Sequence, residues 1–444
     1  MNASLEKAKT KAGAKLVFVW ANSKPRVMTM LPIARALSQV GYCVFMGLPT
    51  SVDADGEEFA DYADIRFLQV QTRDLHALSA IDVCIASETA IGHAPNKAIR
   101  IAVYHSLPDH ALRYDYANVF KRRPQSVAES DFFCISVQQK SNDWTVDNYK
   151  DLTDNLMPVA LLKYRRKTLT MVPLGYPKID LLMSEAGTAP QLDTITYAPT
   201  QTVMAFSSVQ ESGGDIIGML LENFPDHRIV FRPYPGADVD ILAPMLAQFA
   251  DDARFSVDTS PTGQDDMMRS AVVITDRSSI AMSYSLGLAR PSVFFAIDGL
   301  GGKDPDGFAA FHPVGYRAGS IDGVKAAVKD ALAKSCDIAA KIEKTRGDYI
   351  YNPGSSAAYL AQIMPDIIAG TARDEWLSLP RAPFAATDKA IVADHIKQLC
   401  AKVGPRHAAT VKKLLKRAFA EQVVQPKPSF RVRVSRALRR LVKR

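Results

Sequence analysis

The sequence predicts an α/β protein with two domains, each built on a parallel sheet. Short runs of β-branched and aromatic residues alternate with segments of helical periodicity, which is the pattern of strand–helix–strand units and parallel sheets. The chain has 444 residues, enough for two or three domains, and 47% of them are hydrophobic, an ordinary globular proportion. A small, polar, proline-containing stretch at 184–193 separates two such series and predicts an interdomain linker.

The first series, assigned to a domain over residues 1–183, begins with an apolar strand at 15–20. The next segment, 27–40, carries Met30, Ile33 and Leu37 on one helical stripe, and Gly41 ends it. A strand at 42–46 completes the first strand–helix–strand unit, and no GxGxxG dinucleotide-binding pattern follows the first strand. Further strands are predicted at 65–70, 81–86, 100–104, 131–136 and 169–173.

The second series is assigned to a domain over residues 194–370. Its most informative part is the β-branched run 272–274, typical of a strand buried on both faces, followed by a polar turn, a helix to about Gly287 and a new strand after Pro291. Other strands are predicted at 194–197, 228–232 and 293–295, and helices at 215–223, 321–334, 337–345 and from 352 to 368.

The polar turn after 272–274 is the predicted chemical centre of this domain. In an open α/β sheet, ligands bind beyond the carboxyl ends of the strands, and the first residues of a helix present free N–H groups and a positive dipole. Ser278 and Ser279 occupy that place, so the turn predicts a phosphate site. The alternative is that both serines only cap the helix.

The residues of this turn resemble a sequence signature of one enzyme family. The segment Ile274–Thr275–Asp276–Arg277–Ser278–Ser279–Ile280, followed by Arg290–Pro291, is similar to a signature of the CDP-glycerol glycerophosphotransferases, the teichoic-acid-type polymerases and primases. The resemblance runs from about residue 15 to 368. It implies the two-domain GT-B arrangement, in which two Rossmann-like domains face each other across a cleft.

Two segments of the first domain also resemble the family. His105–Ser106–Leu107–Pro108 is similar to a His-Gly-Thr-Pro segment, with Ser for Gly and Leu for Thr, and the resemblance implies that His105 is the base that activates the acceptor hydroxyl. The alternative for His105 is a loop histidine bonded to nearby backbone. The segment 175–180 is similar to a Gly-x-Pro-Arg-x-Asp stretch, with Lys178 in place of the Arg.

The remaining donor-side residues follow two strands of the second domain. Tyr-Ala-Pro-Thr ends at Thr200, whose hydroxyl is predicted to face the cleft. Arg232 stands in the family's Arg-x-His-Pro motif, where a guanidinium suits phosphate oxygens. A structural salt bridge is the alternative for Arg232. Two residues depart from the family: Tyr234 replaces a functional His, and Ser283 replaces an Asp. The predicted donor-binding set is therefore Thr200, Arg232, Tyr234, Thr275, Asp276, Ser278 and Ser279.

The positive charge of the chain lies at its C-terminal end. The net charge is +7, but twelve Lys/Arg and one acidic residue follow position 410, so the preceding residues carry −4. Segments at 411–419 and 430–444 are basic and amphipathic, which favours binding to an anionic membrane surface; a disordered tail and a nucleic-acid arm are the alternatives. Without stacking aromatics between the charges, no nucleic-acid partner is expected. Residues 371–444 are therefore assigned to a linker, over about 376–387, and a basic helical tail.

The expected location is the cytoplasm, peripheral on the inner face of the cell membrane. The first fifteen residues have no apolar core and do not form a signal peptide, and no apolar run is long enough to span a membrane. The five cysteines are odd in number, scattered and without a metal-binding pattern, as expected of buried thiols in a reducing compartment. The motifs imply no cofactor and no metal.

Together these features predict a transferase that moves glycerol phosphate, or a related nucleotide-activated group, from a CDP-type donor to a hydroxyl acceptor. The resemblance implies a lipid-linked or polymeric acceptor and a place in cell-surface glycopolymer or capsule synthesis. Three alternatives remain: a GT-B glycosyltransferase that uses nucleotide sugars, an enzyme like the UDP-sugar 2-epimerases, and a degenerate member that binds without catalysis. The epimerase would need paired acidic residues in the cleft, which the sequence does not place.

Overall fold

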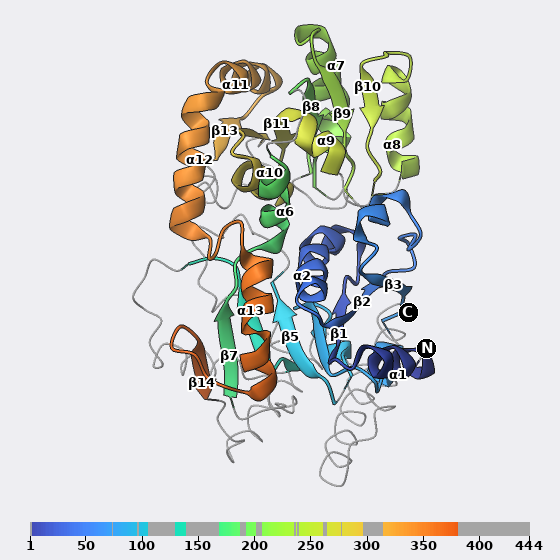
Figure 1. The fold of residues 1–444 in the computed structure, drawn as a ribbon. Helices are drawn as coiled ribbons and strands as arrows, with labels where there is room; N and C mark the ends of the chain where they lie inside the picture. The colour runs from blue at the N-terminus through green and yellow to red at the C-terminus, as the bar shows by residue number, and fades with distance from the viewer. Residues whose placement is uncertain are drawn as a thin grey trace, which may run out of the picture.

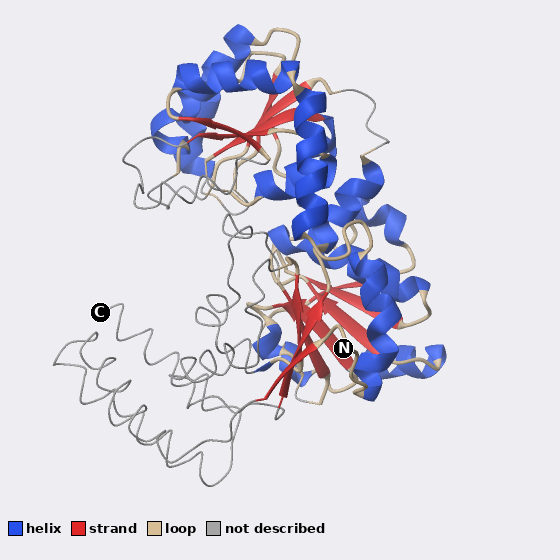
Figure 2. Ribbon diagram, turned by 90° about the vertical axis from the view of Figure 1, so that its left-hand side faces the viewer, coloured by secondary structure: helices blue, strands red, loops and turns tan. Residues whose placement is uncertain are grey.

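A computed structural model describes residues 2–72, 74–95, 97–104, 129–138, 168–186, 192–200, 207–234, 237, 239–260, 264–276, 278–295 and 314–380. Within these residues the chain forms two separate sheets, drawn one above the other in Figure 1 and Figure 2, with helices packed around each. The predicted architecture of two α/β domains with parallel sheets is confirmed.

The first sheet has eight strands in the order β14-β7-β6-β5-β4-β1-β2-β3, and all its pairings are parallel except that of β14 with β7. Its strands are β1 (Leu16–Trp20), β2 (Cys43–Leu48), β3 (Arg66–Gln69), β4 (Val83–Ser87), β5 (Ile99–Val103), β6 (Phe132–Ile135), β7 (Thr168–Pro173) and β14 (Leu377–Pro380). The helices of this part are α1 (Asn2–Ala12) and α2 (Val27–Gln39).

The central strands of the first sheet are apolar on both faces because both faces are covered. Leu16, Phe18 and Trp20 of β1 belong to one hydrophobic cluster, and Val17 and Val19 belong to a second on the opposite face. Alternating side chains of one strand point to opposite faces, so a continuous apolar run is what a doubly covered parallel sheet requires.

The second sheet has six parallel strands in the order β10-β9-β8-β11-β12-β13. Its strands are β8 (Thr194–Tyr197), β9 (Arg228–Phe231), β10 (Phe255–Val257), β11 (Ser270–Thr275), β12 (Ser292–Phe295) and β13 (Gly315–Ala318). The remaining helices are α6 (Pro177–Glu185), α7 (Val209–Asn223), α8 (Val239–Leu246), α9 (Gln264–Arg269), α10 (Ile280–Leu288), α11 (Ile321–Ala333), α12 (Ser335–Tyr349) and α13 (Ser356–Ala369).

The chain crosses between the two sheets twice, and the second crossing differs from the predicted domain boundary. The apolar side chains of α13, including Leu360, Ile363 and Ile367, pack in a core cluster of the first sheet together with Trp376. β14 then extends that sheet at its edge. Residues 356–380 therefore complete the first domain, although the sequence assigned 194–370 to the second domain and part of 376–387 to a linker. Helical periodicity shows which face of α13 is buried but not which sheet buries it.

Helices α6 and α13 are joined by a buried carboxylate where the two crossings meet. Asp180 of α6 accepts hydrogen bonds from the Gly354 N–H at 2.9 Å, the Ser356 hydroxyl at 3.1 Å and the Ala357 N–H at 3.2 Å, so it caps the start of α13. Gly175, two residues before α6, has φ of 100°, and a Cβ there would lie 2.1 Å from the Tyr351 oxygen. The Gly-x-Pro-Lys-x-Asp stretch therefore fixes the junction of the two domains.

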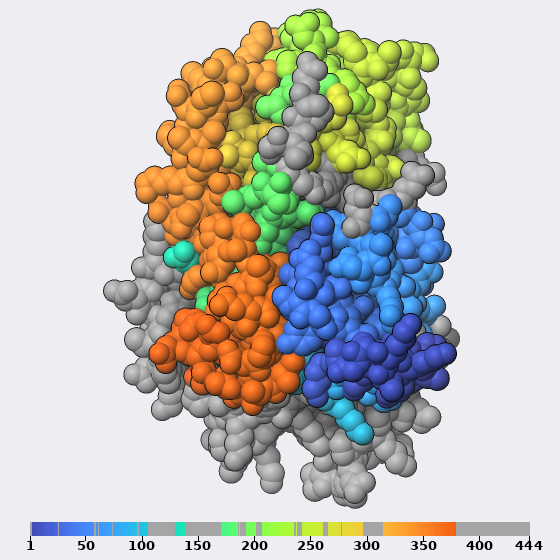
Figure 3. All heavy atoms as spheres, viewed as in Figure 1, coloured from blue at the N-terminus to red at the C-terminus, as the bar shows by residue number. Residues whose placement is uncertain are grey.

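Helix α6 lies at the boundary between the two domains. It packs against α10 of the second domain and against α2 and α13 of the first. In Figure 3 its green spheres lie directly above the boundary between the orange α13 and the dark blue α2. The first turn of α6 is therefore placed where the carboxyl ends of the two sheets approach each other.

Candidate functional site

In the turn between β11 and α10, the threonine and the aspartate form hydrogen bonds with other residues of the protein. Thr275 is fully buried, and its hydroxyl donates a hydrogen bond to the Ala198 oxygen at 2.6 Å. This bond joins the carboxyl ends of β11 and β8, which are neighbours in the sheet. Thr275 therefore positions the turn, and a contact of its hydroxyl with a donor stays a prediction.

Asp276 has a similar role. Its side chain is 1% exposed; one carboxylate oxygen accepts from the Thr200 N–H at 2.8 Å, and the other accepts from the Ser208 N–H at 2.9 Å and the Ser208 hydroxyl at 3.1 Å. Thr200 and Ser208 flank residues 201–206, which lie outside the described part of the chain. Asp276 thus ties Thr200 and Ser208 to the end of β11, which is a positioning role. A contact of Asp276 with a donor stays a prediction.

Ser278 and Ser279 are the part of the turn that stays available. Both are half-buried, and Ser279 precedes α10 without making a side-chain capping bond. The Ser278 oxygen accepts only a long bond, 3.5 Å, from the Ile280 N–H, and no described residue accepts a hydrogen bond from either hydroxyl. Two hydroxyls therefore lie at the positive end of a helix dipole, at the carboxyl edge of a parallel sheet, where ligands of such sheets bind. Binding of a phosphate by Ser278 and Ser279 stays a prediction.

Ser283, one of the two departures from the family, lies at the boundary of the domains. Tyr176, the residue before α6, is buried with its phenol beside the hydroxyls of Ser283 on α10 and Thr29 on α2. Burial raises the pKa of Tyr176 to about 12, an effect that the two hydroxyls oppose. Ser283 therefore contributes to the contact between domains.

Arg232 follows β9 and forms a salt bridge, which was the structural alternative for this residue. The side chain is 7% exposed and forms an ion pair with Asp258, itself 7% exposed, while Nη2 donates to the Ser260 oxygen at 3.2 Å. These buried contacts of the guanidinium hold the loop after β10 against the end of β9. Tyr234 is half-buried, two residues farther along. A direct contact of Arg232 or Tyr234 with a donor remains a prediction.

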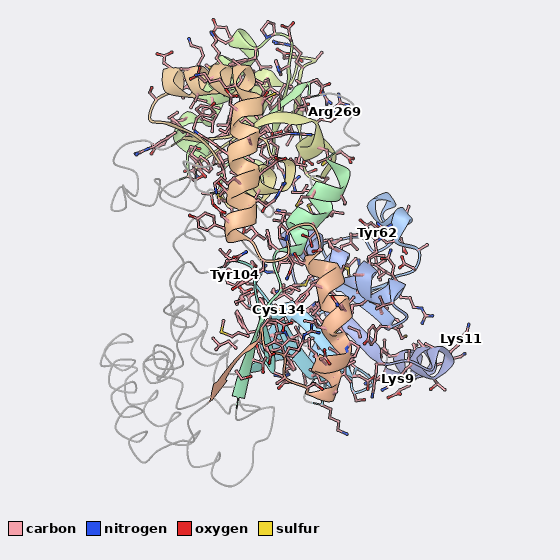
Figure 4. All side chains as sticks on the ribbon, turned by 60° about the vertical axis from the view of Figure 1, so that its left-hand side comes forward. Lys9, Lys11, Tyr62, Tyr104, Cys134 and Arg269 are labelled. Carbon is pink, nitrogen blue, oxygen red and sulfur yellow. The ribbon has the colours of Figure 1, made fainter. Side chains whose placement is uncertain are left out.

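The predicted base, His105, lies outside the described residues. β5 ends at Val103, and Tyr104 donates from its backbone N–H to the Cys134 oxygen at 3.3 Å. Figure 4 shows Tyr104 at the end of the first sheet that is turned toward the second sheet. The strand that leads to His105 therefore points at the junction of the domains, and the role of His105 stays a prediction.

Two charged residues near the junction were missed by the sequence analysis. Glu88 directly follows β4, is 1% exposed, and donates from its backbone N–H to the Val103 oxygen at 3.1 Å, so it lies beside the end of β5. Lys178, noted only as a departure from the family, lies in the first turn of α6 close enough to Arg232 to feel its charge. Their positions after a strand and at a helix start are the only sequence signals for them.

The described residues contain no cluster of three or more potential metal ligands, and none of their helices is long and apolar enough to cross a membrane. The predicted basic tail and its membrane contact lie outside this part of the chain.

Comparison with known proteins shows the fold and no closer relationship. No protein-family model matches the chain, and no curated protein matches it. Among solved structures, the wall teichoic acid polymerase TagF has a TM-score of 0.53 at 15% identity, over 84% of this chain and 94% of that one. A putative UDP-N-acetylglucosamine 2-epimerase from Listeria monocytogenes has a TM-score of 0.51 at 13% identity, over 82% and 99%. The S. aureus MnaA–UDP structure has a TM-score of 0.50 at 13% identity, over 81% and 98%. The chain therefore has the two-domain GT-B-type fold that these enzymes share.

Proposed function

We propose that this protein is a transferase that moves glycerol phosphate, or a related nucleotide-activated group, from a CDP-type donor to a hydroxyl acceptor. The observation that carries the proposal is the turn before α10, where the Ser278 and Ser279 hydroxyls are not donated to any described residue. The words of the turn resemble the family signature, and the fold resembles that of a teichoic acid polymerase.

The proposed reaction is a displacement at the phosphorus that carries the glycerol. The acceptor oxygen attacks the β-phosphorus of the donor, the bond to the bridging oxygen breaks, and CMP leaves with the electron pair. His105 takes the proton of the acceptor hydroxyl, and α10 with Ser278 and Ser279 stabilises the charge on the phosphate oxygens. Thr275 and Asp276 keep the turn in place through their buried hydrogen bonds.

Transfer from a nucleotide sugar, or epimerisation of a UDP-sugar, is the competing function. Glu88 favours it, because a buried carboxylate at the carboxyl edge of the first sheet could handle a proton of a sugar. The likeness in fold to a putative UDP-N-acetylglucosamine 2-epimerase, and to MnaA solved with UDP, fits the same alternative. The departures at Tyr234 and Ser283 support a third possibility, a binding protein without turnover.

Substitution of His105 by alanine tests the catalytic proposal. We expect the release of CMP from CDP-glycerol, in the presence of a hydroxyl acceptor, to fall by about 10²–10⁴ because general-base catalysis is lost. The control is His227→Ala, which changes a histidine at the amino end of β9, where it contacts Phe224. Parallel assays with UDP-sugars, measuring UDP release and epimer formation, separate the alternatives. Unchanged CMP release in the variant would remove His105 from the mechanism.

The acceptor is proposed to be lipid-linked or polymeric and to be reached at an anionic membrane through residues 411–444, at roughly 1 kcal/mol per basic residue near the surface. Sedimentation with phosphatidylglycerol vesicles is expected to pull down the full chain but not a chain that ends at residue 410. Sedimentation with zwitterionic vesicles is the control, and equal binding of both chains would contradict this role of the tail.

A further inference from the structure

Lys178 lies at the start of a helix, where its positive charge is unfavourable. It follows Pro177 in the first turn of α6, so it lies at the positive end of that helix dipole, where a cation is disfavoured. Its side chain is partly buried, and α6 packs directly against α10, whose own positive end carries Ser278 and Ser279. Figure 1 shows the two helices side by side between the sheets.

No described residue neutralises the Lys178 ammonium. It forms no ion pair or hydrogen bond with any residue in the described part of the chain, and the described charge that acts on it is the positive charge of Arg232. Burial, with a smaller contribution from Arg232, lowers the pKa of Lys178 to about 8. Charged or titratable groups on the elements packed against α6 do not offset this effect; they are Arg35 on α2, Asp265, Asp266 and Arg269 on α9, Tyr284 on α10, and Tyr359 and Asp366 on α13.

Arg232 cannot take over the role of an anion-binding cation without giving up a buried pair. Its guanidinium is held by Asp258 and by the Ser260 oxygen. Among the described residues, Arg232 therefore has an acidic partner and Lys178 has none. Helix α10, which begins after Ser278 and Ser279, packs against α6, the helix that carries Lys178. An ammonium is a compact charge on a flexible stem, which suits the variable oxygens of a diphosphate.

We propose that Lys178 binds the diphosphate of a nucleotide-linked donor, together with the Ser278 and Ser279 end of α10. This inference rests on the proposed function for the position of the donor. It makes Lys178 the residue that neutralises the phosphate charge, although the family resemblance places Lys178 outside the donor motifs. A bound diphosphate would also raise the pKa of Lys178 back toward its ordinary value. At pH 8.5 to 9.5, binding would therefore be accompanied by the uptake of a proton on Lys178.

Calorimetric titration with CDP, UDP, inorganic pyrophosphate and cytidine tests the assignment. In Lys178→Met we expect the affinity for the strongest-binding diphosphate to fall by about ten- to a hundred-fold, the range of a charge-assisted hydrogen bond, and the affinity for cytidine to stay within twofold. In the wild type, titrations at pH 9 in buffers of different ionisation enthalpy should show proton uptake, and this uptake should be absent from the variant.

The control variant is Lys329→Met, which removes the same charge from an exposed position on α11. Thermal melting without ligand checks the fold, and Lys178→Met should melt at or above the wild-type temperature because a disfavoured charge is gone. Lys178→Arg should retain most of the affinity. Any of three results would overturn the assignment. They are a diphosphate affinity of Lys178→Met within twofold of the wild type, an equal loss of cytidine and diphosphate affinity in that variant, and no diphosphate binding by the wild type. Diphosphate binding through Lys178 without group transfer would reject the proposed function alone.

Discussion

Replacement of Asp276 by alanine is expected to lower the free energy of unfolding by about 3–5 kcal/mol. The carboxylate is 1% exposed and accepts three hydrogen bonds, two of them from the backbone N–H groups of Thr200 and Ser208. The substitution removes the acceptor and leaves those donors buried, and each unsatisfied buried group costs about 1–3 kcal/mol. Denaturant unfolding followed by circular dichroism would measure the loss.

The same experiment separates a positioning residue from a ligand contact. Asp252→Ala is the matched control, because that carboxylate is on the surface, paired with Arg254, and its loss should lower the stability far less than the loss of Asp276. Ser208→Ala leaves both backbone bonds of Asp276 in place but removes the bond from the Ser208 hydroxyl to the carboxylate and the bond between that hydroxyl and the buried Tyr197 phenol, so it should cost about 1–3 kcal/mol. An Asp276→Ala protein with wild-type stability that no longer binds CDP would show that Asp276 contacts the donor directly.

Arg232→Met is expected to destabilise the protein by about 3–5 kcal/mol, because it leaves the buried Asp258 carboxylate without its guanidinium partner. Arg254→Met, which breaks an ion pair at the surface with side chains about one-third exposed, should cost about 1 kcal/mol or less. The measurement is denaturant unfolding of both single variants, of Asp258→Ala and of the Arg232→Met/Asp258→Ala double variant.

The double variant decides whether the pair itself is responsible. If the two groups act on each other, the loss in the double variant should be smaller than the sum of the single losses by at least about 1 kcal/mol. Additive losses, or an Arg232→Met variant of normal stability with weakened donor binding, would favour the original prediction that Arg232 contacts phosphate.

Much of the fold was predictable because its signals are local. The strand at 272–274, its polar turn and the helix that follows were predicted in order, and the structure has them as β11, the turn and α10. The helix predicted over 27–40 is α2, which ends at Gln39. β10, β13 and β14 were not predicted. All three lie at sheet edges, and most side chains of β10 and β13 are partly buried or exposed, so these strands lack the continuous apolar run of an internal strand.

The roles within the site were less predictable because they depend on partners far away in sequence. Thr275 and Asp276 belong to a motif that resembles a ligand-binding signature, yet their hydrogen bonds go to residues 68 to 77 positions away in the chain. Arg232 meets Asp258 only because β10 lies beside β9. The chemistry of each side chain could be read from the sequence, but its target could not.

The sequence by itself determined the type and order of most of the main elements, the parallel sheets and the polar turn at the carboxyl end of β11, since hydrophobic period and helix-start chemistry act over a few residues. Only the tertiary structure decided that α13 and β14 return to the first sheet, that Asp180 joins α6 to α13, and that Lys178 lies near Arg232. These arrangements depend on how two sheets share one junction, where long-range packing and the burial of charge determine the result.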